Sequence, residues 1–117
     1  MATLWFQSKS MSRLLALVFA AFLGASAHAA DTEFAMVIKS HQFVPAEIKV
    51  PANQRIKLNV HNQDSTPEEF ESHSLKREKL IPGGAKALIS IGPLKPGRYE
   101  FFGEFNQATA KGVVVVE

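Results

Sequence analysis

The chain of 117 residues contains no cysteine. It cannot form a disulfide, and every metal centre that requires a thiolate ligand is excluded, including Cys-ligated zinc, iron–sulfur clusters and type 1 copper. The chain also lacks a charge surplus outside its first thirty residues. Subtracting Lys9 and Arg13 from the thirteen basic residues leaves eleven, against eleven acidic ones. Without a basic patch, we expect no nucleic acid among its partners.

No apolar run near the N-terminus is long enough to cross a membrane. Residues 14–23 form an apolar run of ten residues, whereas a spanning helix needs about 20. Lys9 and Arg13 precede this run, and the small residues of the Ala27-His28-Ala29 pattern follow it. These features predict a secretory signal peptide over residues 1–29, with a retained membrane anchor as the alternative.

The remaining domain, residues 31–117, shows no convincing amphipathic helix. Apolar residues alternate with polar ones in several short segments that are separated by proline, glycine and asparagine. This spacing predicts a single all-β domain, a β-sandwich of about seven strands. The one window that favours a helix is residues 74–80, at most two turns long.

Two stretches of the chain resemble the cupredoxin family. Residues 43–62 contain the pattern Phe-x-Pro-x-x-Ile-x-Val-Pro and end in an asparagine, and residues 94–101 contain Leu-x-Pro-Gly-x-Tyr-x-Phe. A glycine-led run of valines, residues 112–116, follows. The resemblance implies a cupredoxin-like Greek-key sandwich with a metal-binding loop between residues 99 and 112.

The loop departs from the copper proteins of that family at two positions. Gly103 stands where the copper-binding Cys would be, and Asn106 stands where a His would be. Asn can coordinate a metal only through its carbonyl oxygen. The resemblance therefore implies the frame of a copper site without type 1 copper, and Asn106 either belongs to a different site or marks its loss.

A second pair of motifs points to a subgroup within the family. Glu69-Phe70-Glu71 and Gly103-Glu104-Phe105 resemble segments of periplasmic cupredoxin-like proteins that accompany bacterial ferrous-iron permeases. The resemblance implies a periplasmic protein of an iron-uptake system, which binds iron, with copper as the alternative. Its implied partners are the metal ion and an inner-membrane iron permease or other periplasmic uptake components.

The glutamates themselves suit such a metal. On a strand, Glu69 and Glu71 point to one face, and Glu68 and Phe70 point to the other. Carboxylates are hard donors that suit iron, manganese, calcium or magnesium better than Cu(I). Anionic oxygens should also favour Fe(III) over Fe(II), which suggests either ferrous oxidation or simple delivery. The competing interpretation is a charged strand edge that discourages pairing with other chains.

Two further residues complete the predicted ligand set. Glu104 lies in the loop that supplies metal ligands in copper cupredoxins, and His73 shares the face of Glu71 if the strand continues. We therefore predict a metal site formed by Glu69, Glu71, Glu104 and His73. The competing interpretation of Glu104 is an exposed charge beside aromatic neighbours.

Other candidates are weaker on sequence grounds. His41 precedes a turn that could lie near the metal end, whereas His61 alternates with apolar residues and should face solvent. Glu78, between Arg77 and Lys79, is expected to be a salt-bridged surface residue. The alternative function is a metal-free binding or scaffold module, in which the carboxylates recognise a partner.

Overall fold

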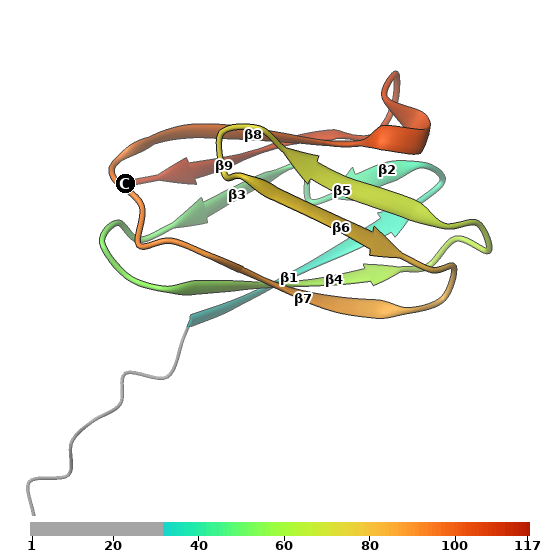
Figure 1. The fold of residues 1–117 in the computed structure, drawn as a ribbon, viewed down its shortest axis with the longest axis horizontal. Helices are drawn as coiled ribbons and strands as arrows, with labels where there is room; N and C mark the ends of the chain where they lie inside the picture. The colour runs from blue at the N-terminus through green and yellow to red at the C-terminus, as the bar shows by residue number, and fades with distance from the viewer. Residues whose placement is uncertain (1–31) are drawn as a thin grey trace, which may run out of the picture.

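The computed structural model describes residues 32–117, and the expected signal peptide lies outside the described residues. Nine strands and one short 3-10 helix make up the fold (Figure 1). They are β1 (Thr32–Lys39), β2 (Gln42–Val44), β3 (Glu47–Val50), β4 (Ile56–Asn62), β5 (Glu68–Ser72), β6 (Arg77–Ile81), β7 (Lys86–Ile91), β8 (Gly97–Gly103), η1 (Glu104–Asn106) and β9 (Lys111–Val116).

The strands form two packed sheets. One sheet has four strands in the order β2-β1-β4-β7, and the other has five in the order β3-β9-β8-β5-β6. In Figure 1, η1 follows β8 at the end of the sandwich where β5 begins. The all-β sandwich predicted from the sequence is confirmed, with two more strands than the expected seven.

The window over residues 74–80, the one that favours a helix on sequence, forms no helix and mostly belongs to the hairpin of β5 and β6. Leu75 is buried in the core, and its backbone N–H donates to Ser72 Oγ at 3.2 Å. Ser72 Oγ donates in turn to the Glu100 carbonyl at 2.6 Å, so the turn between β5 and β6 is fixed to β8. Within residues 32–117, no helix has the length and apolar character needed to cross a bilayer.

Alternating side chains supply the core between the sheets. Phe43, Phe70 and Phe101 are each at most 3 % exposed and come from β2, β5 and β8. Their ring centroids lie 4.9–6.0 Å apart, in two edge-to-face pairs and one stacked pair. Because Phe70 points inward at the centre of β5, its neighbours Glu69 and Glu71 must point outward.

Candidate metal site

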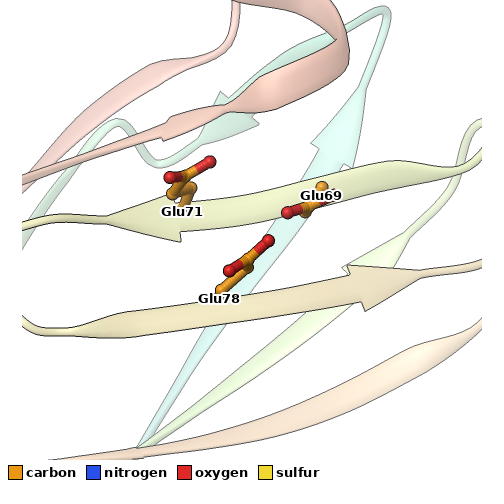
Figure 2. A group of neighbouring side chains, drawn as sticks. All are labelled: Glu69, Glu71 and Glu78. Atoms are coloured by element: carbon orange, nitrogen blue, oxygen red, sulfur yellow. The ribbon is translucent and has the colours of Figure 1, made fainter.

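Three glutamates meet on the outer face of the five-stranded sheet. Glu69 and Glu71 come from β5, and Glu78 lies on β6 directly opposite Glu71 in the antiparallel register. One carboxylate oxygen from each lies within 4.8 Å of the others. Figure 2 shows the carboxyl groups of Glu69 and Glu78 turned toward each other across the two strands.

A fourth glutamate approaches from the loop after β8. Strand β8 pairs with β5 on the side away from β6, with Phe102 opposite Glu71. Glu104 begins η1 just beyond β8, and its side chain forms a hydrogen bond with Glu71. The fold thus brings Glu104 close to Glu71, while the predicted ligand role of both residues stays a prediction. We call Glu69, Glu71, Glu78 and Glu104 the acidic cluster.

The crowding raises the proton affinity of two members of the acidic cluster. A hydrogen bond with Glu78 is the largest cause, and burial and the neighbouring negative charges add to it, so that the pKa of Glu69 rises to about 7. The hydrogen bond with Glu104, followed by burial and like charges, also raises the pKa of Glu71. Hydrogen bonds between acids and the nearby like charges thus favour the protonated form of both carboxyl groups.

Acidic neighbours dominate the electrostatics of this cluster. Charges on Glu78, Glu104 and Glu71 raise the pKa of Glu69, whereas the charge of His73 acts in the opposite direction on the pKa of Glu71. Carboxylates that face one another without a cation repel when ionised, and a bound cation would relieve that repulsion. The geometry therefore supports a hard, oxygen-ligated metal ion as the chemistry of this face.

His73 lies beside the cluster rather than within it. Strand β5 ends at Ser72, so His73 stands in the following turn, where its exposed ring lies 5.6 Å from the ring of Phe102. A shallow hollow of about 280 Å³ has His73, Glu71 and Glu78 in its wall. The predicted ligand role of His73 stays a prediction.

The other two histidines of residues 32–117 lie apart from the acidic cluster. The His41 ring Nδ1 lies 3.7 Å from Asp64 Oδ2, and a hydrogen bond from the His41 backbone N–H is the main reason that the pKa of Asp64 is lowered. His61 is only partly exposed and lies on β4 of the opposite sheet. Asp64 Oδ1 also accepts a hydrogen bond from the Ser40 backbone N–H, so His41 belongs to a contact between two loops.

Glu78 is the residue that sequence reasoning undervalued. It was expected to pair with a basic neighbour, yet it faces Glu69 and Glu71 across the β5–β6 hairpin. The window over residues 74–80 favours a helix on sequence and gives no signal of this register. A turn assigned to residues 73–76 would have predicted the hairpin and placed Glu78 opposite Glu71.

The loop position at which the resemblance implies a copper-binding cysteine, Gly103, is closely packed by other residues. Glu68 is only 1 % exposed and points inward from β5. A Cβ atom at Gly103 would lie 2.6 Å from Glu68 Cδ and 2.7 Å from Ala110 Cβ, so no cysteine fits there without a shift. Asn106 Nδ2 donates to Glu68 Oε2 at 2.6 Å. These residues do not fit a type 1 copper ion.

The frame around this position is nevertheless recognisable. The profile of the family described as "Cupredoxin-like domain" matches residues 13–116. The chain belongs to the cupredoxin-like domain family. This cupredoxin-like chain is also 49% identical over 84 residues, 72% of its length, to the "Uncharacterized protein RP394" of Rickettsia prowazekii (strain Madrid E), of which it covers 67%.

Solved structures show the same fold at low sequence identity. The metal-binding domain of the Cu(I)-exporting P-type ATPase CopA of Streptococcus pneumoniae D39 matches with a TM-score of 0.66 and 17% identity, over 73% of this cupredoxin-like chain and 84% of that one. Auracyanin A, a blue copper protein of Chloroflexus aurantiacus, matches with a TM-score of 0.65 and 11% identity, over 75% and 100%. The fold is thus that of copper-binding proteins.

Proposed function

We propose that this protein is a periplasmic iron-binding protein of a ferrous-iron uptake system. The acidic cluster binds the iron, and the protein delivers it to an inner-membrane permease or to another periplasmic component. The single observation that carries the proposal is the convergence of Glu69, Glu71 and Glu78 within 4.8 Å on one sheet face.

The ligand type selects among metals. All four members of the cluster offer carboxylate oxygens, and copper in its reduced state prefers sulfur and nitrogen donors. Iron binds hard anionic oxygen, and Fe(III) gains more than Fe(II) because of its higher charge. The cluster therefore favours iron over Cu(I) and favours the ferric state, which would lower the reduction potential of the bound ion.

The cellular setting rests on two sequence features. The signal-peptide pattern over residues 1–29 supports export, and the Glu69-Phe70-Glu71 and Gly103-Glu104-Phe105 motifs resemble periplasmic proteins that accompany iron permeases. Iron that has been captured outside the inner membrane has to reach a transporter. A small carrier with an open, solvent-facing site suits such a transfer.

Anaerobic calorimetric titration with Fe(II) tests the proposal. We expect one saturable site in the parent protein and an affinity lower by on the order of 100-fold in the double variant Glu69→Gln, Glu71→Gln, which keeps the side-chain shape but removes two charges. Glu100→Gln is the matched control, because Glu100 is an exposed glutamate of β8 outside the acidic cluster. Its affinity should equal that of the parent.

Two outcomes would contradict the assignment. Equal affinity in the parent and in the double variant would place the iron elsewhere. No binding by the parent would support the alternative of a metal-free scaffold module. Admitting air after anaerobic loading separates oxidation from delivery, because dioxygen can then accept an electron from Fe(II). If the site promotes oxidation, the absorbance of Fe(III) should grow faster with the parent than with the double variant.

A further inference from the structure

The buried carboxylate of Glu68 is bound entirely by donors of the protein. Its Oε1 accepts from the backbone N–H of Glu69 at 3.0 Å and of Phe105 at 2.9 Å, and its Oε2 accepts from Asn106 Nδ2 at 2.6 Å. A buried carboxylate is tolerated only when such bonds replace its hydration. Two of the three donors belong to η1, so Glu68 joins β5 to that turn.

Besides the side-chain hydrogen bond between Glu104 and Glu71, the turn has little that attaches it to β5. None of the residues of η1 is buried, and the residue before it, Gly103, has no side chain with which to cap the first turn. Its remaining backbone bonds run forward, from the N–H groups of Thr109 and Ala110 to the Asn106 carbonyl at 3.1 and 2.8 Å. The contact with Glu68 is therefore the principal hydrogen-bonded link between η1 and β5.

The same turn carries one member of the acidic cluster. Glu104 directly precedes Phe105, whose backbone N–H is held by Glu68, and the Glu104 side chain reaches Glu71 on the outer face. Glu68 and Glu104 thus act on opposite sides of one short segment. Fixing the Phe105 backbone on the inside fixes where Glu104 stands on the outside.

We propose that Glu68 is a positioning residue: its buried carboxylate anchors η1 and holds Glu104 against Glu71 in the acidic cluster. The anchoring rests on the hydrogen bonds alone, and only the effect on iron rests on the proposed function. In this arrangement the interior of the loop is closed to metal, and the outer face of the same strand binds it.

Hydrogen exchange of the metal-free protein tests the anchor. The Phe105 amide should exchange on the order of tenfold faster in Glu68→Ala than in the parent, while Glu68→Gln, which keeps an oxygen acceptor, stays close to the parent. The amides of Leu58 and Val60 in β4 should keep their protection, which separates local loosening from unfolding. If Glu68→Ala proves unstable, Asn106→Ala, which removes one bond, should accelerate the same amide.

A double-mutant cycle with Fe(II), titrated anaerobically, tests the positioning. Glu68→Ala should lower the affinity about tenfold in the parent background and less than twofold in Glu104→Gln, because the effect passes through Glu104. Glu68→Gln should restore most of the affinity. A merely structural role would cost the same in both backgrounds.

The outcomes distinguish this inference from the proposed function. A Phe105 amide that stays as protected in folded Glu68→Ala and Asn106→Ala as in the parent overturns the anchor, whatever the protein binds. Equal losses in the two backgrounds overturn the positioning of Glu104. A parent that binds no iron overturns the proposed function and the effect on iron, while the exchange result still decides whether Glu68 anchors η1.

Discussion

Neighbouring glutamates of one strand meet two different environments. Glu68 points inward from β5, is 1 % exposed and accepts hydrogen bonds from three donors of the protein. Glu69 and Glu71 point outward and meet other glutamates. The inner carboxylate is satisfied by amides, whereas the outer ones face other acids that raise their pKa values.

The difference shows that the partners, not the residue type, decide what a carboxylate can do. A carboxylate whose oxygens accept from N–H groups has its lost hydration replaced and contributes to the fold. Carboxylates surrounded by carboxylates are poor anions until a cation arrives. Because side chains alternate between the two faces of a strand, the five residues of β5 carry both kinds of carboxylate.

The largest expected effect is the loss of folding stability when the inward-facing carboxylate of Glu68 is removed. Glu68→Ala leaves the donors of Phe105 and Asn106 without an acceptor and should lower the free energy of unfolding by about 3 kcal/mol. Chemical denaturation at neutral pH measures it. Glu71→Ala is the comparison on the outer side and should cost far less, since it removes a repelling charge. An equal loss of unfolding free energy in the two variants would contradict the distinction between the inward-facing and outward-facing glutamates.

Filling the space under Glu68 should have the next largest effect. A methyl group at Gly103 would meet Glu68 Cδ and Ala110 Cβ, so Gly103→Ala should destabilise the fold by about 2 kcal/mol. Gly97→Ala on the same strand is the control, because the nearest atom to its Cβ would be Tyr99 Cε2 at an ordinary 3.6 Å. Similar denaturation midpoints for the two variants would show that the position is not closed.

The sequence predicted the sandwich and the outward pair, but it could not predict which carboxylate packs against Gly103. Strand alternation places Glu69 and Glu71 together because it is a local property. The contact between Glu68 and Asn106 joins residues 38 positions apart and depends on how β5 and β8 align. Glu78 was undervalued for a similar reason, since its partner depends on the hairpin register.

The pH dependence of stability should come from the outward-facing glutamates of the acidic cluster. Because the folded-state pKa of Glu69 is raised to about 7 from 4.5, the folded protein binds more protons than the unfolded chain between these values. The metal-free protein should therefore lose stability as pH rises from about 4.5 to 7 and change little through this group above that range. Thermal melting in metal-free buffers from pH 5 to 8 measures it, and the effect should be modest because the site is partly exposed.

Glu78→Gln provides the control for that pH dependence. The substitution removes the charge of the residue that contributes most to the raised pKa of Glu69. The fall in melting temperature between pH 5 and 8 should become shallower in this variant. An unchanged slope would mean that the acidic cluster does not generate the pH dependence. Saturating Fe(II), added anaerobically, should raise the melting temperature of the parent most at the high end of the range, where protons no longer compete.

The smallest expected effect is that of His73, which the sequence predicts to be a ligand and which lies beside the acidic cluster in the structure. The ring lies beside Phe102 and outside the group of carboxylates within 4.8 Å, so His73→Ala should change the Fe(II) affinity by less than about threefold. Glu71→Gln, two residues earlier, should lower it by on the order of tenfold under the same conditions. A loss for His73→Ala as large as that for Glu71→Gln would show that the turn after β5 moves inward on binding and that His73 is the nitrogen ligand that the strand pattern predicts.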